Sequence, residues 1–279
     1  MNTLRVVVFF LGSAVSLWGT DCCLSGGARS INSLQAMQRI DLGLATSFQD
    51  YSSWYNFSLQ ASTTARLNPN LEMFGRLPLI QHRVDLKTKR DSQTSLGDVG
   101  LGLRMTLLRS LFVEDPHPTV SWVVGAKLPT GTQDLQVGNL FQSRSGNGLF
   151  EPLVGLSFSK EYYDWLVAID FSYTRLQGKI SNLLVEDNQV NVTETLSYAL
   201  NRNWQMGAGS NQLWSFGRKL NRSALADPTG KSLSVFGLLN YYVTPFTSLG
   251  AHVDWAFETL SRNQPATRSA SLSVRYGFY

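Results

Sequence analysis

Apolar and polar residues alternate one by one along most of the chain. In "GDVGLGLRMTLL" (97–108), Val99, Leu101, Leu103, Met105 and Leu107 stand on one side, and Asp98, Arg104 and glycines stand on the other. A period of two is typical of a β-strand with one apolar face, and not of a helix. The same pattern returns as far as the closing segment "SASLSVRYGFY". It predicts an all-β chain of about 12 antiparallel strands, each of about 9 to 12 residues, the length of a tilted membrane-spanning strand.

The lengths of the connections favour a transmembrane β-barrel over a soluble β-sandwich. Alternation fits both, because each class hides one face of every strand from water. The turns "LNPN", "NRN" and "TPFT" are short and follow every second strand. The other connections are longer, and we expect the basic segment "HRVDLKTKRDSQ" and residues 129–150 to be loops. Short turns at one end and long loops at the other are typical of outer-membrane barrels.

Aromatic residues gather near both predicted ends of the strands. At the short-turn end these are Trp122, Tyr162, Trp165, Tyr198, Trp204, Tyr241, Tyr276 and Phe278. At the long-loop end they are Phe48, Phe57, Tyr173, Trp214, Trp255 and Phe257. Amphipathic rings are most stable at the two lipid–water interfaces, so the placement predicts two girdles around a barrel.

Composition and the N-terminal segment agree with an exported membrane protein. Charged residues make up 16% of the 279 residues, and the net charge is only +4. No basic run with interleaved aromatics is present, so we expect no nucleic-acid partner. The segment "MNTLRVVVFFLGSAVSLWG" has an early positive charge and a short apolar run. It predicts a signal peptide within residues 1–28, cleaved between about 19 and 28, with the barrel over 29–279.

The charges on the polar faces of the strands predict the lining of the barrel interior. The candidate residues are Glu72, Arg76, Asp98, Arg104, Lys127, Asp170, His252, Asp254 and Arg275. Their signs nearly balance, so strong ion selectivity is not indicated, and internal ion pairs are expected beside contacts with a solute. The segment 129–150, the longest connection, is the candidate constriction.

No catalytic residue, cofactor or metal site is predicted. The three histidines are His82, His117 and His252. His252 shares the polar face with Asp254, but a histidine that lines the interior explains this placement without catalysis. The cysteines, Cys22 and Cys23, are adjacent and lie near the predicted cleavage region, so no disulfide framework is expected.

Two regions raise separate questions. Glu194, Ser210 and Gln212 fall on the expected lipid face, where a carboxylate is costly. Either a bulge changes the register, or strands near 190–216 face another protomer or a lateral opening. The chain closes on Tyr276, Phe278 and Tyr279, which resembles the terminal aromatic signal that the barrel assembly machinery recognises.

Three segments resemble a family of outer-membrane transporters named for an association with the meta-cleavage pathway of phenol degradation. They are "LGDVGLGLRMTLL" (96–108), "PTVSWVVGAKLPTGTQD" (118–134) and "GNGLFEPLVGLSFSKEYYDWLVAIDFSYT" (146–174). The resemblance implies an outer-membrane channel or carrier for small, often apolar or aromatic, solutes that diffuse passively. Two alternatives stay open: a barrel enzyme that hydrolyses lipids or peptides, and a non-conducting barrel that presents surface loops.

Overall fold

A computed structural model gives the fold of the chain over most of its length. It describes residues 39–51, 54–86, 89–110, 115–131, 135–137, 141–143, 149–180, 183–220, 223–224, 230–244, 246–257 and 267–278. The predicted signal peptide, within residues 1–28, lies outside these ranges, as does Tyr279. Among the described residues, no helix is long and apolar enough to cross a lipid bilayer.

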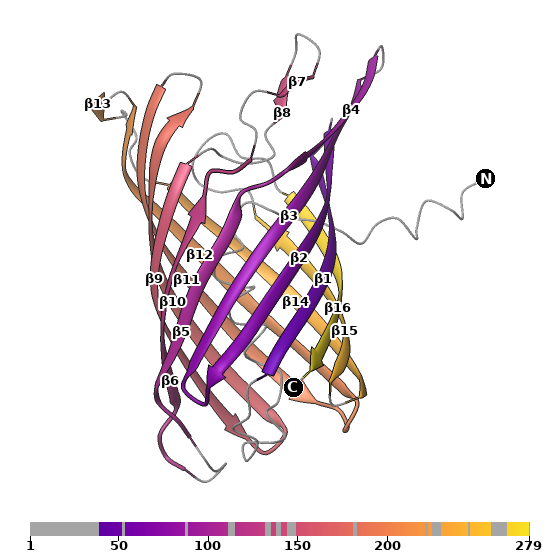
Figure 1. Ribbon diagram of the computed structural model, residues 1–279, viewed down its shortest axis with the longest axis vertical. Coiled ribbons are helices and arrows are strands. Elements are labelled where there is room, and N and C mark those ends of the chain that lie inside the picture. The colour runs from indigo at the N-terminus through magenta and orange to yellow at the C-terminus, as the bar shows by residue number, and fades with distance from the viewer. Residues whose placement is uncertain are drawn as a thin grey trace, which may run out of the picture.

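The described residues form one antiparallel sheet that closes on itself, together with a separate small hairpin (Figure 1). The strands are β1 (Arg39–Tyr51), β2 (Trp54–Asn68), β3 (Leu71–Leu86), β4 (Lys89–Leu96), β5 (Val99–Leu108), β6 (Thr119–Leu128), β7 (Leu135–Val137), β8 (Phe141–Ser143), β9 (Leu149–Tyr162), β10 (Trp165–Ile180), β11 (Leu183–Ala199), β12 (Trp204–Leu220), β13 (Ser223–Ala224), β14 (Gly230–Thr244), β15 (Thr247–Ala256) and β16 (Thr267–Phe278). The short strands β7 and β8 form the hairpin, and β4 and β13 are additions to the barrel wall.

The wall therefore has 12 strands, as the sequence predicts. Strand β1 pairs with β16, where Leu42 faces Tyr276 and Ile40 faces Phe278. The pairing of β11 with β12 completes the ring. Every backbone group between the interfaces can then pair within the wall, which is what hydrocarbon requires. The prediction that the last strand closes the barrel is confirmed, whereas its role as an assembly signal stays a prediction.

Large apolar side chains are exposed on alternate positions of the wall, and polar side chains face inward. The exposed set includes Leu42, Leu44, Leu101, Leu103, Val154, Leu156, Val167, Leu272 and Val274. The buried set is mostly polar and includes Ser58, Asp98, Ser121, Glu151, Asp170, Thr174, Asn191, Thr193, Ser197, Asn211, Ser234 and Ser269. This arrangement is the reverse of a soluble core, and it is the one expected of a barrel surrounded by lipid.

Aromatic rings mark both edges of the exposed apolar band. At the short-turn edge, Trp165 lies against Tyr198 with ring centroids 4.6 Å apart, and Trp204 lies against Tyr241 at 4.6 Å. At the other edge, Tyr173 lies 6.5 Å from Phe216. Eight residues of about 3.4 Å separate Trp165 from Tyr173, or roughly 21 Å along the membrane normal for a strand tilted by ~40°. That height suits a hydrocarbon core, so these rings form the predicted girdles.

Several segments that the sequence predicted as loops are strands that extend beyond the girdle. The segment 82–93 is not a loop, because His82 pairs with Gln93 and the pairing continues to Leu86 with Lys89. Likewise β10 runs to Ile180, and β11 returns from Leu183. Figure 1 shows β4, β7, β8 and β13 at this end of the molecule, far from the short turns. Outside the membrane neither face of a hairpin meets lipid, so alternation no longer reveals these strands.

The register at β11 and β12 settles one of the two questions from the sequence. Glu194 is exposed, as is Leu196 two residues further on. The register partner of Glu194 on β12 is Ser210. The one register shift in this pair lies between Glu186 and Asn188, beyond the girdle. A bulge therefore does not turn Glu194 inward, and its carboxylate is on the outer surface.

Candidate functional site

The barrel interior is the candidate site. Eight of the nine predicted lining residues lie on its strands, and Asp98 lies between β4 and β5. Their positions alternate with exposed apolar ones, and Asp98 and Asp170 are buried. The structure joins some of them in two ion-pair clusters on the wall formed by β2, β3, β5, β6 and β9. It does not join His252 to Asp254: the imidazole lies 5.2 Å from the Phe236 ring, and Asp254 accepts hydrogen bonds from Ser234 and Ser269. That these residues contact a solute stays a prediction.

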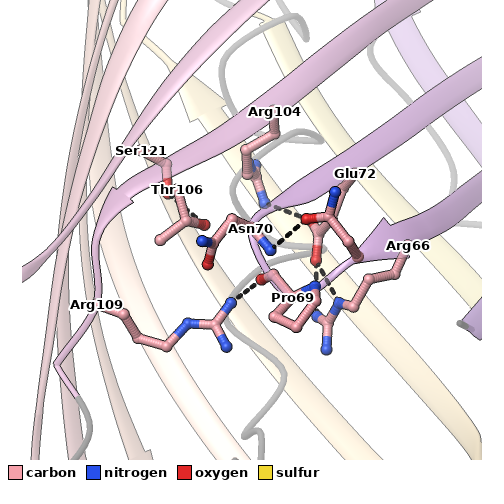
Figure 2. A network of polar contacts seen from close by, with 9 residues as sticks. Arg66, Pro69, Asn70, Glu72, Arg104, Thr106, Arg109 and Ser121 are labelled. Carbon is pink, nitrogen blue, oxygen red and sulfur yellow. Dashed lines mark hydrogen bonds and ion pairs between the residues drawn. The ribbon is translucent and has the colours of Figure 1, made fainter. Parts of the chain in front are cut away.

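The first cluster lies beside the short turn between β2 and β3 (Figure 2). Glu72 Oε1 accepts hydrogen bonds from Arg66 Nε at 2.9 Å and Arg66 Nη2 at 2.7 Å. Arg104 Nη1 lies 3.7 Å from Glu72 Oε2 on the other side. The three residues are register partners on β2, β3 and β5, so one carboxylate links three strands.

The turn itself is held by contacts to the neighbouring strands. Arg109 donates a hydrogen bond to the carbonyl oxygen of Pro69, and Thr106 N–H donates to the carbonyl of Asn70 at 2.7 Å (Figure 2). Thr106 and Ser121 hydroxyls lie 3.4 Å apart, which extends the network to β6. These contacts fix the end of the wall that the sequence predicted to be compact.

The second cluster lies toward the long-loop end and has Lys127 at its centre. Lys127 Nζ lies 2.5 Å from Glu151 Oε1 and 3.9 Å from Asp98 Oδ2. Both carboxylates are almost completely buried, with side-chain exposures of 6% and 4%. Lys127 and Glu151 are register partners on β6 and β9. The Lys127 ammonium group thus lies between two buried negative charges, and the Arg76 guanidinium group also attracts Glu151.

Backbone contacts join the same strands at this point. The register of β3 shifts by one residue between β4 and β5, where Gly97 and Asp98 interrupt the wall. Thr130 Oγ1 donates to the carbonyl of Gly97 at 3.0 Å and accepts from Val99 N–H at 2.9 Å. Gly131 N–H donates to Asp98 Oδ1 at 2.9 Å. The "GD" and "KLPTG" segments of the sequence therefore bind each other.

Glu151 is an inward residue that the sequence did not predict, because residues 129–150 were expected to form a loop, whereas β9 begins at Leu149. The signal was present, because the phase of Gly155, Ser157 and Ser159 extends back to Glu151.

Two inward phenylalanine rings lie close against glycines of the adjacent strand. A Cβ atom on Gly209 would come 2.4 Å from Phe236 Cζ, and one on Gly102 would come 2.3 Å from Phe74 Cζ. No side chain larger than hydrogen fits beneath either ring. The Phe74 and Phe236 rings therefore lie over glycines of the adjacent strand.

Replacing Gly209 by Ala should test this packing. The new methyl group would overlap Phe236 and would also come 2.1 Å from the Glu194 carbonyl oxygen. We expect a loss of about 1–3 kcal/mol in the free energy of unfolding, as in other overpacked sites. Gly237→Ala is the matched control, because its Cβ would meet nothing closer than 4.0 Å. Urea unfolding in lipid vesicles measures both, and equal stabilities would contradict the proposed packing.

The inward cations are unevenly distributed around the wall. The membrane segments of β2, β3, β5 and β6 carry one cation each, Arg66, Arg76, Arg104 and Lys127, and Arg275 lies on β16. The segments 165–173, 190–198, 204–214, 232–241 and 249–255 contain no Lys or Arg. Their inward charges are Asp170 and Asp254. Carboxylates therefore lie on both sides of the interior, because Glu72 and Glu151 pair with cations on the first group of strands, whereas this second group of strands carries no inward cation.

The comparisons with known proteins agree with this architecture. A family model described as "Putative MetA-pathway of phenol degradation" matches residues 36–276. The COG4313 outer membrane channel from Pseudomonas putida F1 superposes with a TM-score of 0.66 at 14% identity, covering 88% of this chain and 97% of that chain. The NanC porin has a TM-score of 0.51 at 14% identity, covering 84% and 98%. The KdgM porin has a TM-score of 0.51 at 10% identity, covering 86% and 99%. No curated protein sequence matches the chain at a significant level.

Proposed function

Because the chain belongs to the family described as "Putative MetA-pathway of phenol degradation", we propose that it is a passive channel for small solutes in the outer membrane of a Gram-negative-type bacterium. The observation that carries the proposal is a closed wall with an apolar outer face and an inner face rich in charged, hydroxyl and amide groups. The similar solved structures include a channel and porins, which supports the same conclusion.

The size of the barrel limits what can pass. Barrels of about 8 strands are filled by side chains, and those of 16–18 strands hold a wide aqueous channel. A wall of 12 strands lies between these limits, so we infer a narrow path. Segment 129–150 remains the proposed constriction. Its described parts include β7 and β8, which lie at the long-loop end (Figure 1), and much of the rest lies outside the described residues.

The lining favours solutes with both an apolar and a polar part. The half-buried Phe74 ring offers an apolar surface, and Ser and Asn side chains of the inner face offer hydrogen bonds. A small aromatic compound with a polar substituent would place its ring against the apolar surface and its substituent near the hydrogen-bonding side chains. We therefore propose solutes of this class, in line with the description of the family.

Conductance of the purified protein in planar lipid bilayers tests the proposal. Stepwise currents in symmetric potassium chloride, with a small unit conductance, are the expected result. A small polar aromatic solute added to one side should reduce the current by occupying the narrow path. A refolded barrel that inserts into the bilayer without any conductance would show that the protein is not a channel.

We also propose that the outer surface around Glu194 meets a second copy of the chain. Glu194 lies four residues from both Tyr198 and Val190, the register partners of the two girdle residues Trp165 and Tyr173. Its carboxylate is therefore near the bilayer midplane, where it accepts a hydrogen bond from Ser210 Oγ at 3.1 Å. The small residues Ala208 and Gly237 are register partners on the adjacent strands β12 and β14, so a second chain could approach the wall closely there. Polar groups next to small residues are typical of contacts between membrane-spanning segments.

Replacing Glu194 by Leu should weaken this association. Light scattering of the detergent-solubilised protein is expected to give an oligomer for the natural chain and a larger monomer fraction for the variant. Thr63→Leu, an exposed polar position on the distant strand β2, is the matched control and should behave like the natural chain. A natural chain that is monomeric at all concentrations would refute the interface.

A further inference from the structure

Four inward side chains form a continuous row across β10, β11, β12 and β14. Asp170 is the register partner of Thr193, Thr193 of Asn211, and Asn211 of Ser234. We call these four residues the oxygen row, because each presents at least one oxygen that accepts hydrogen bonds. Thr193 directly precedes Glu194 in β11, so the oxygen row lies on the inner face of the wall near the bilayer midplane.

The oxygen row is buried but its acceptors are not all used. Thr193 is only 1% exposed and Asn211 only 6%. The atoms Thr193 Oγ1 and Asn211 Oδ1 have no hydrogen-bond partner among the described residues, and neither has Asn191 Oδ1, two residues along β11. Leaving buried polar atoms without a partner is costly, and such atoms in a folded protein indicate a missing water, ion or ligand.

The charges around the oxygen row define what would fill it. The strands that carry it contain no Lys or Arg between the girdles, and the Asp170 carboxylate is at one end. Arg66, Arg76, Arg104 and Lys127 lie on other strands of the wall, β2, β3, β5 and β6. An anion would be repelled by Asp170, whereas a cation or an N–H donor finds complementary oxygens at Asp170, Thr193 and Asn211. One carboxylate with neutral oxygens is too little charge for a strong calcium site.

We propose that the oxygen row is a weak binding site for a small monovalent cation, either an inorganic ion or the primary ammonium group of a solute. A weak site suits a channel, because an ion must leave as readily as it enters. The site would give one side of the narrow path a preference for positive charge, and it rests on the proposal that solutes traverse the interior.

Chemical-shift titration of the refolded barrel in detergent tests the site without requiring conductance. Potassium chloride and methylammonium chloride are added separately, at an ionic strength held constant with tetraethylammonium chloride. Saturable shifts of the Thr193 and Asn211 backbone amides are expected. Saturation with both salts would identify a site for positive charge, and saturation with methylammonium alone would identify one for N–H donors. Absence of saturation with either salt would overturn the proposal.

Four variants connect the shifts to the unpaired oxygens. Thr193→Val and Asn211→Leu each remove one acceptor and should weaken binding by about tenfold, as expected for a hydrogen bond to a charged group. Thr193→Ser keeps the hydroxyl and should bind like the natural chain. Thr195→Val, two residues away on the same strand, is the matched control and should also bind normally. Equal binding by Thr193→Val, Asn211→Leu and the natural chain would overturn the assignment.

The outcome for the site is separate from the outcome for the channel. Saturable shifts in a barrel without conductance would support the site and refute the passive channel. Conductance without saturable shifts would support the channel and refute the site.

Discussion

Lys127→Met is expected to destabilise the barrel by about 3 kcal/mol, the lower end of the range for a broken buried ion pair. The substitution keeps the length of the side chain but leaves the buried carboxylates of Glu151 and Asp98 without the ammonium group between them. Urea unfolding in lipid vesicles, followed by the heat-dependent shift of the folded band on a gel, measures the loss.

Two further variants show whether charge causes this effect. Lys127→Arg keeps a cation and should lose much less stability. Adding Glu151→Gln to Lys127→Met should recover part of the loss, because one of the two buried negative charges is removed. If Lys127→Met is as stable as the natural chain, the second cluster does not hold β5, β6 and β9 together.

Leu44→Arg should be the most harmful substitution on the outer face, with a cost of about 2–4 kcal/mol for a cation at the bilayer midplane. Leu44 is 49% exposed and lies between Ile40 and Phe48, which pair with girdle residues Phe278 and Phe57. Its register partners, Ala61 and Val274, offer no negative charge.

Leu67→Arg is the matched control for depth. Leu67 is 43% exposed on the same outer face, but it lies next to the short turn between β2 and β3. An arginine there reaches the headgroups, so the cost should be at most ~1 kcal/mol. Equal costs at the two positions would mean that Leu44 does not face hydrocarbon. The same unfolding assay serves for both variants.

The sequence predicted the barrel because the membrane imposes a pattern that residues cannot avoid. Between the girdles each outward residue meets lipid and each inward residue meets polar groups. The apolar Leu103 and the charged Arg104 therefore indicate which face of β5 points to lipid and which points inward. Beyond the girdle this constraint ends. The paired segments around His82 and Gln93 therefore looked like a loop, although they continue β3 and β4.

Side-chain partners inside the barrel were harder to predict than the strands. Lys127 and Asp98 were expected inside, but their association depends on the register shift at Gly97, which the alternation does not reveal. Phe236 stood in an apolar run, "VFGLL", in which both faces look alike. Its inward direction follows from Gly209 on β12, a neighbour that only the strand order identifies.

Spin-label accessibility along β16 tests the central claim most directly. Single-cysteine variants at Ser271, Leu272, Ser273 and Val274, made without Cys22 and Cys23, carry a nitroxide in lipid vesicles. Oxygen, which concentrates in hydrocarbon, should collide most with labels at 272 and 274, and a water-soluble nickel complex should reach mainly 271 and 273. Uniform accessibility, or the opposite alternation, would contradict a wall with lipid outside and polar groups within.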